Sequence, residues 1–95
     1  MHYLKVFWKH EHADEPVWLY SELDDDRWEI RKVEQFADGS TGYASRDAAE
    51  GGSKLSIEPL PALEEIAEDP QFTPSLIDAD EFDKVWRRRL DKLRV

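Results

Sequence analysis

The sequence contains no cysteine, and it has no long apolar run. The absence of cysteine excludes disulfide bridges and thiolate chemistry, and it fits a reducing compartment. A helix that crosses a bilayer needs about 20 apolar residues, which no segment approaches, and the start MHYLKVFWKH lacks the apolar core of a signal peptide. We therefore expect a soluble, cytoplasmic protein with no membrane partner.

Motifs for catalysis are also missing. No Ser–His or Cys–His pair has a supporting context, and the GGSK run at residues 51–54 lacks the spacing of a phosphate-binding loop. His10 and His12 point the same way on an extended segment, but no third zinc ligand follows within reach. Catalysis is the least supported class of function, and we expect no catalytic residue, metal site or cofactor.

Basic residues are scarce in most of the chain, which has a formal net charge of −9. Residues 1–83 carry 7 basic and 21 acidic side chains, whereas residues 84–95 carry 6 basic and 1 acidic. An acidic body repels nucleic acid and attracts basic partners over a Debye length of about 8 to 10 Å. We therefore expect no nucleic-acid partner. The basic side chains of residues 84–95 suit the C-terminal turns of a helix, where they complement the helix dipole.

Aromatic side chains are abundant, at 12% of the 95 residues. This content and this length predict one domain over residues 1–95 with its own core. Residues 2–9 and 17–23 predict strands. Residues 27–37 allow two interpretations. Ile30, Val33 and Phe36 have helical spacing, whereas a strand with a β-bulge near Arg31-Lys32 leads better into a turn at Asp38-Gly39 and a strand over 40–45. We favour the strand.

The second half of the chain predicts two helices, with a short strand before them and a linker between them. Residues 55–58 suit a short strand, 61–69 a short helix, and 71–77 a linker whose Phe72 and Ile77 contact the core. Asp78 begins the strongest helix, whose apolar stripe runs over Phe82, Val85, Trp86, Leu90 and Leu93. The predicted class is α+β, a mostly antiparallel sheet of three to five strands with this amphipathic helix on one face and a short additional helix.

Several segments also resemble a known family. They are YLKV-x-W near the start, PVWLYSELDDDRWEIRKVEQFADGSTGYASRD, PLPALEEIAEDPQF, and EFDKVW near the end. Together they resemble a family of small, acidic bacterial proteins catalogued only as a domain of unknown function. The resemblance covers nearly the whole chain and implies a single domain that begins close to residue 1. It assigns no activity and no role to any residue.

The composition favours a non-catalytic binding protein, most readily an immunity or antitoxin-like protein that neutralises a basic partner such as a toxin. In this hypothesis, carboxylates imitate phosphates while aromatic side chains anchor the contact. The residues predicted to bind the partner are Trp18, Tyr20, Glu22, Asp24, Asp25, Asp26, Trp28 and Glu29.

The alternative is a regulatory domain that binds a small anionic ligand. Basic side chains and a tyrosine on a concave sheet face would hold such a ligand in a pocket. The residues predicted for this site are Arg27, Arg31, Tyr43 and Arg46.

Overall fold

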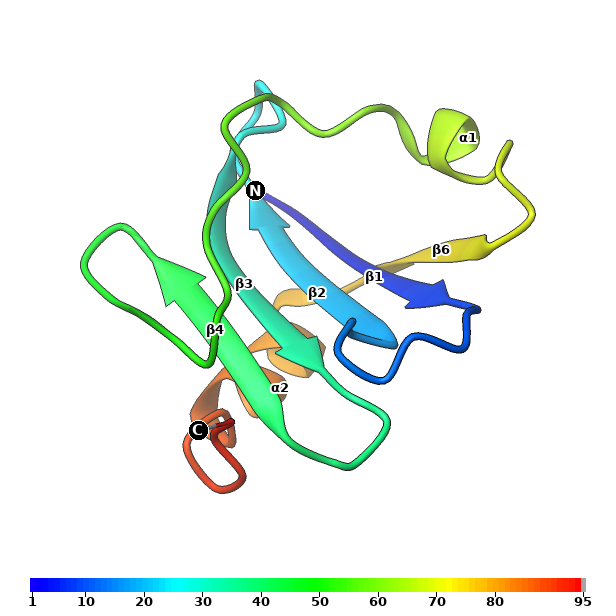
Figure 1. Cartoon of the computed structure of the whole chain (residues 1–95). Coiled ribbons are helices and arrows are strands. Elements are labelled where there is room, and N and C mark those ends of the chain that lie inside the picture. The colour runs from blue at the N-terminus through cyan, green and yellow to red at the C-terminus, as the bar shows by residue number, and fades with distance from the viewer. Residues whose placement is uncertain (95) are drawn as a thin grey trace.

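A computed structural model describes residues 1–94, and it contains one antiparallel sheet of six strands (Figure 1). The order across the sheet is β5-β4-β3-β2-β1-β6, so β5 and β6 form its edges. The strands are β1 (His2–Trp8), β2 (Trp18–Leu23), β3 (Glu29–Gln35), β4 (Thr41–Ser45), β5 (Ala49–Glu50) and β6 (Phe72–Ile77). The helices are α1 (Leu63–Ile66) and α2 (Ala79–Arg87).

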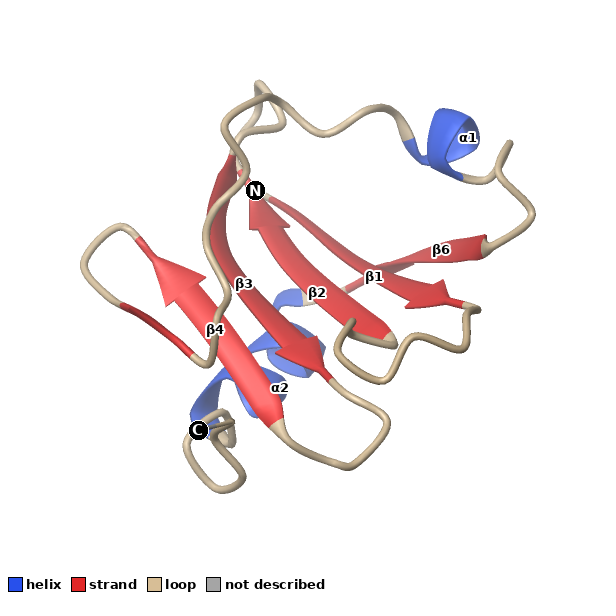
Figure 2. Ribbon diagram, in the orientation of Figure 1, coloured by secondary structure: helices blue, strands red, loops and turns tan. Residues whose placement is uncertain are grey.

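The fold is mainly β, with 14% of the chain in helices, and Figure 2 shows how little of it is helical. The prediction of an α+β class with three to five strands and a long amphipathic helix is therefore wrong. Two segments account for the additional strands. The two-residue β5 lies within the predicted connector over 46–54, and β6 occupies the predicted linker over 71–77.

The edge strand β6 explains how a proline can lie within a strand. Lys9 N–H donates to the Gln71 carbonyl over 2.7 Å, which makes these two residues a hydrogen-bonded pair. From there along β1 and β6, non-hydrogen-bonded and hydrogen-bonded pairs alternate. Pro74, opposite Val6, is not in a hydrogen-bonded pair, so its missing N–H would face away from β1. The Phe72 N–H, on the same outer edge, donates to the Asp69 carbonyl. This edge therefore offers few free donors to another strand.

The strand prediction for residues 27–37 is confirmed by β3, which pairs with both β2 and β4. The register shifts beside Glu22 and Leu23, which face Arg31 and Glu29, so Ile30 is the extra residue of a bulge. The bulge thus precedes the predicted position at Arg31-Lys32. Gly39 has a φ of 87° in the turn that leads to β4, as the Asp38-Gly39 pair predicts.

The helix α2 begins as predicted but ends early. Glu81 N–H donates to Asp78 Oδ1 over 2.8 Å, which confirms the N-terminal cap. After Arg87 the chain bonds to β4 instead of continuing the helix. Thr41 Oγ1 donates to the Arg89 carbonyl over 2.6 Å, and Thr41 N–H donates to the Lys92 carbonyl over 2.8 Å. The predicted stripe therefore does not continue past the helix, and Leu90 is 57% exposed.

The segment between β5 and β6 also differs from its prediction. Residues 55–58 form no strand. Hydrogen bonds to a side chain and to a turn of the sheet hold the segment, and no strand pairs with it. Ser56 N–H donates to Glu29 Oε1 over 2.7 Å, and Leu60 N–H donates to the Arg27 carbonyl over 2.9 Å. The helix α1 covers four residues only, fewer than the predicted 61–69.

The sheet is covered differently on its two faces (Figure 1). On one face, α2 packs over β2 and β3. On the other, residues 51–62 cross the sheet towards α1. Buried apolar side chains lie on both faces: Val33, Tyr43 and Phe82 on the α2 side, and Leu4, Val6 and Ala44 on the other. No helix within residues 1–94 is long and apolar enough to cross a membrane.

Candidate functional site

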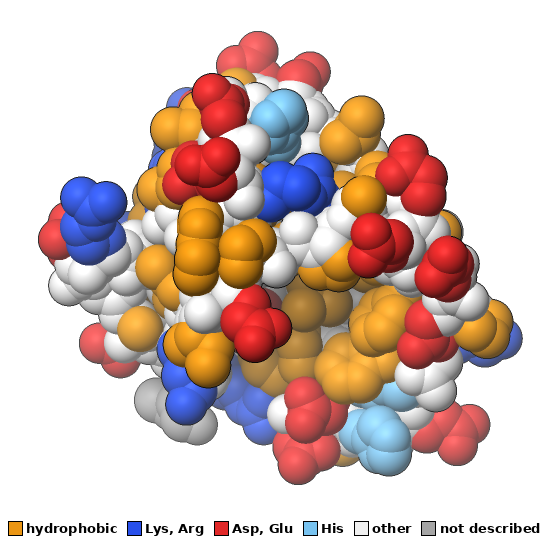
Figure 3. Space-filling view, turned by 90° about the horizontal axis from the view of Figure 1, so that it is seen from above, with side chains coloured by type: hydrophobic (Ala, Val, Ile, Leu, Met, Phe, Trp, Pro, Cys, Tyr) orange, Lys and Arg blue, Asp and Glu red, His pale blue; other side chains and the backbone are white. Residues whose placement is uncertain are grey.

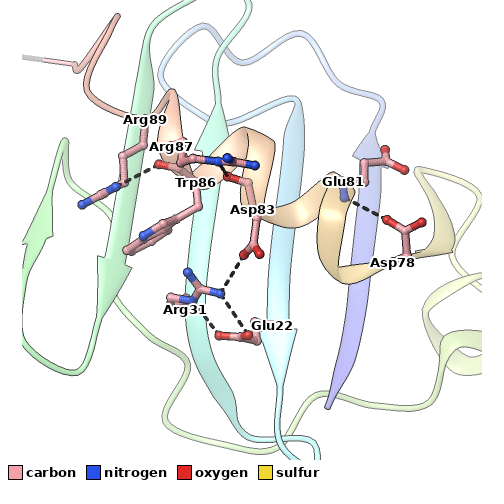
Figure 4. Close-up of polar contacts among 8 residues, drawn as sticks. All are labelled: Glu22, Arg31, Asp78, Glu81, Asp83, Trp86, Arg87 and Arg89. Atoms are coloured by element: carbon pink, nitrogen blue, oxygen red, sulfur yellow. Dashed lines mark hydrogen bonds and ion pairs between the residues drawn. The ribbon is translucent and has the colours of Figure 1, made fainter.

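Two of the carboxylates predicted to bind a partner are buried, on opposite faces of the sheet. Glu22 faces α2, where it accepts two hydrogen bonds from Arg31, at 2.6 and 3.0 Å, and Arg31 also bonds to Asp83 over 3.2 Å (Figure 4). The hydrogen bonds from Arg31 hold the pKa of Glu22 below its usual value. Glu29 lies on the other face and its side chain is 3% exposed. Neither carboxylate is available to a partner protein.

The acidic turn between β2 and β3 is exposed, but its first residue has a structural role. Asp24 Oδ1 accepts hydrogen bonds from the N–H groups of Asp26 and Trp28, both at 2.9 Å, and so caps the turn. Asp25 is 90% exposed and lies 3.6 Å from the N-terminal ammonium. Trp28 is 43% exposed. Asp25, Asp26 and Trp28 are thus the members of the predicted set that the turn presents to solvent.

Trp18 and Tyr20 lie on the α2 face of β2, in a row that runs away from Glu22. The rings of Trp18 and Phe7 are 5.0 Å apart, those of Trp18 and Tyr20 are 6.4 Å apart, and the Lys5 ammonium lies 5.5 Å from the Trp18 ring. All four side chains are half-buried. The rings of Phe7, Trp18 and Tyr20 form an aromatic strip that is separate from the acidic turn.

The structure does not bring together the four residues predicted for an anionic ligand. Arg27 donates to the carbonyls of Leu60 and Pro61, at 3.0 and 2.7 Å, and Arg31 is engaged by Glu22 and Asp83. Tyr43 is buried in the core beneath the guanidinium of Arg89, which lies 4.6 Å from its ring. Arg46 is exposed between β4 and β5. No observation favours an anion site formed by these side chains.

The histidine loop is held by its own hydrogen bonds. His10 Nε2 lies 2.8 Å from the Pro16 carbonyl, and His10 Nδ1 accepts the N–H of His12 over 2.9 Å. Both ring nitrogens of His10 are therefore occupied. Within residues 1–94 no group of three or more side chains is arranged to hold a metal ion.

The face opposite α2 carries two hollows, and the crossing segment over residues 51–62 borders both. Several contacts fix this segment to the sheet. Gly42 of β4 has no side chain, which lets the backbone of Gly51 and the hydroxyl of Ser53 lie directly over it, and Ser53 donates to Glu34. Figure 3, which looks at the molecule from above, shows a hollow with hydrophobic side chains at its floor and acidic side chains around it.

The first hollow, here called the acidic cleft, has a volume of about 720 Å³. It lies where the loop before β2, the end of β3, the β5 turn and the C-terminal segment meet. Four carboxylates line it, against two cations. The lining residues that matter for its charge are Asp14, Glu15, Glu34, Glu50, Lys54 and Arg94.

One of the two cations already occupies part of the acidic cleft. The Arg94 guanidinium lies 4.1 Å from the centre of the Phe36 ring, and Arg94 Nη1 donates to the Asp14 carbonyl over 3.3 Å. Arg94 N–H also donates to the Thr41 carbonyl over 2.6 Å, which fixes the backbone at this point. The cleft thus combines an aromatic surface with surrounding carboxylates, an arrangement that accommodates a guanidinium.

The second hollow, here called the apolar cleft, has a volume of about 390 Å³ and lies between the sheet, the crossing segment and α1. Its walls are mainly apolar. At its floor, Glu29 accepts hydrogen bonds from Ser21 Oγ over 2.9 Å and pairs with Lys32 Nζ over 3.1 Å. The apolar residues of its lining are Val6, Leu19, Leu60, Pro61, Ile66 and Phe72. Leu19 and Glu34 are cross-strand partners, so the two clefts meet at neighbouring residues.

The sequence analysis missed both clefts. Their residues come from segments far apart in the chain, and only the pairing of β2, β3 and β4 brings them to one face. A usable signal was the alternation in β3, because Lys32 and Glu34 fall on the face opposite Arg31 and Val33. Gly42 was a second signal, since a glycine within a strand often marks a close backbone approach.

The family model for a domain of unknown function, DUF6881, matches residues 2–91, which include every strand and both helices. The chain belongs to this family. No curated protein and no solved structure matches this chain. Membership in DUF6881 assigns no chemistry to either cleft.

Proposed function

We propose that this protein is a non-catalytic binding protein that captures a basic segment of a partner protein in the acidic cleft. The observation that carries the proposal is the position of Arg94, whose guanidinium lies on Phe36 inside a cleft lined by four carboxylates. A partner's arginine or lysine would find the same environment. The cleft therefore has a chemistry suited to basic side chains.

The charge of the whole molecule supports the same partner class. Residues 1–83 carry 21 acidic and 7 basic side chains, and the exposed Asp25 and Asp26 add to the field that attracts a basic protein. These two residues lie at the other end of the strands from the acidic cleft, so we expect them to affect the rate of encounter more than the lifetime of the complex.

The biological role that suits such a domain is that of a bacterial immunity or antitoxin-like protein acting in the cytoplasm. A small acidic protein can neutralise a basic toxin by covering the surface that the toxin uses to bind nucleic acid. The lack of cysteine fits a reducing compartment. The aromatic strip of Phe7, Trp18 and Tyr20 provides a second surface for such a partner.

The test is capture of partner proteins from the source cell on the immobilised parent protein and on two charge variants. The Asp14→Asn/Glu15→Gln variant removes two carboxylates from the acidic cleft. The control, Glu64→Gln/Glu68→Gln, removes the same charge from exposed positions on and after α1 that line neither cleft. Captured proteins are identified by mass spectrometry, and their affinities are then measured with purified components.

We expect a strongly basic protein that binds the parent and the control but binds the cleft variant at least several-fold more weakly. The proposal is wrong if no basic protein is captured. It is also wrong if both variants lose binding equally, because the interaction would then depend on net charge and not on the cleft.

A further inference from the structure

The apolar cleft carries an inference that does not depend on the partner protein. We infer that it is a binding site for a small organic cation with an apolar body, such as an aromatic or branched alkyl amine. Its volume of about 390 Å³ falls in the range of small-molecule sites, which run from about 300 to 1,000 Å³. That space suits a ligand about the size of a bicyclic aromatic ring.

The walls of the apolar cleft determine the body of the ligand. Val6 and Leu19 come from the sheet, Leu60 and Pro61 from the crossing segment, and Ile66 from α1. These side chains face one space from three sides, so an apolar ligand placed there would be removed from water where it touches these walls. The crossing segment is held by its bonds to Glu29 and Arg27, so the cleft exists before a ligand enters.

The charges of the cleft determine the sign of the ligand. At the floor, the Glu29 carboxylate is satisfied by Ser21, Lys32 and the Ser56 N–H, and the paired charges of Glu29 and Lys32 offset each other. At the rim, Glu65 and Asp69 are both exposed and carry two negative charges. A cation linked to the apolar body would therefore lie between these two carboxylates, and an anion would be repelled.

A hydrogen bond at the floor would add to the recognition. The Lys32 ammonium has three N–H groups, its side chain is 14% exposed, and the structure pairs it with Glu29. An ether or carbonyl oxygen on the inner end of the ligand would accept one of the remaining N–H groups. The best ligands of this class therefore carry an acceptor at one end and an amine at the other.

The inference is tested by titrating three probes into isotopically labelled protein and following backbone amide signals by NMR. The probes are naphthylethylamine, its anionic counterpart naphthylacetate, and ethylamine, which has the cation without the apolar body. We expect naphthylethylamine to give saturable shifts at Leu60, Ile66 and Phe72. Gly51 and Gly52, which line the acidic cleft, should not shift.

Variants separate the apolar and ionic contributions. Ile66→Trp should fill the cleft and abolish the shifts, while Glu65→Gln/Asp69→Asn should weaken binding about fivefold, as expected for two exposed charges. The Asn side chain still accepts the Gln71 N–H that Asp69 Oδ1 accepts in the parent. The matched control is Glu64→Gln/Glu68→Gln, which should bind as the parent does.

The inference is overturned if naphthylacetate binds as tightly as naphthylethylamine, or if ethylamine alone gives the same shifts. It is also overturned if the shifts appear only at the acidic cleft. None of these results contradicts the capture of a basic protein, so the two proposals fail independently.

Discussion

The guanidinium of Arg31 lies 4.9 Å from the centre of the Trp86 ring, and this contact joins the middle of the sheet to α2 (Figure 4). Arg89 stacks on the same ring at 4.0 Å, so the tryptophan is in contact with two guanidinium groups. Arg31 also bonds to Glu22 in the sheet and to Asp83 in α2. One arginine therefore links the two layers by an aromatic contact and by its ion pair with Asp83, while its ion pair with Glu22 joins two strands of the sheet.

Replacing Arg31 by methionine should destabilise the protein by about 3 kcal/mol, because the largely buried Glu22 would lose its partner. Urea unfolding of Arg31→Met measures this cost. The Arg31→Met/Glu22→Gln double variant is the control, and it should recover part of the loss because the buried carboxylate is no longer charged, while Asp83 is exposed enough to remain hydrated. A change of less than about 1 kcal/mol in Arg31→Met would contradict the linking role of Arg31.

The Glu22–Arg31 pair also predicts a dependence of stability on pH. Hydrogen bonds from Arg31 lower the pKa of Glu22 from its usual value of 4.5, so the folded state binds a proton at Glu22 less readily than the unfolded state does. The contribution to stability is then complete above pH 4.5 and is lost as the pH falls through the lowered pKa.

The measurement compares the free energy of unfolding of the parent and of Glu22→Gln between pH 6 and pH 3. The parent should be the more stable at pH 6, and the difference should shrink as the pH falls below 4.5. Because other carboxylates titrate in both proteins, the difference isolates Glu22. A difference that stays constant over this range would contradict the prediction.

Gly42 allows the crossing segment to lie on β4, and this predicts a sensitive position. A Cβ at residue 42 would lie 2.5 Å from Ser53 Oγ and 2.9 Å from the Gly51 carbonyl oxygen. Gly42→Ala should therefore cost about 1 to 3 kcal/mol, as overpacking does. In a Ser53→Ala background one obstacle is gone, and the same substitution should cost less. Equal costs in both backgrounds would show that the segment does not lie there.

The strands that pair in hairpins could be predicted from the sequence, because the Asp38-Gly39 turn and the period-two pattern are local signals. β6 could not, since its assignment depends on β1 lying beside it, and Pro74 argues locally against a strand. The end of α2 could not be predicted either. The apolar spacing continues to Leu93, but Thr41 binds the carbonyls of Arg89 and Lys92.

The candidate site likewise depends on contacts between distant segments, which local sequence signals do not predict. Composition indicated an acidic surface, but it gave no means to separate the buried Glu22 and Glu29 from the exposed Asp25. The register shift at Ile30 is decisive here, because it places Glu29 on the face opposite Arg31. Without the register, the two faces of β3 cannot be assigned around the bulge, and the clefts cannot be assembled from their separate segments.

Arg94 occupies the place where the proposed partner's basic side chain would lie, so removing it should strengthen partner binding. Arg94→Gln frees the Phe36 ring and removes one positive charge from the acidic cleft. Lys54→Gln is the matched control, because it removes the same charge from the same cleft without uncovering Phe36. The affinities of both variants for the captured partner are measured by calorimetry at low salt and again at about 0.5 M salt, where the screening length is roughly 4 Å.

At low salt both variants should bind more tightly than the parent, because each lowers the net charge of the cleft. At high salt the gain of Lys54→Gln should largely vanish, whereas Arg94→Gln should keep a gain, because a contact between a guanidinium and a partly buried ring is screened less than an exposed charge. If the two variants behave alike at both salt concentrations, the Phe36 surface does not take part in binding, and the acidic cleft acts through its charge alone.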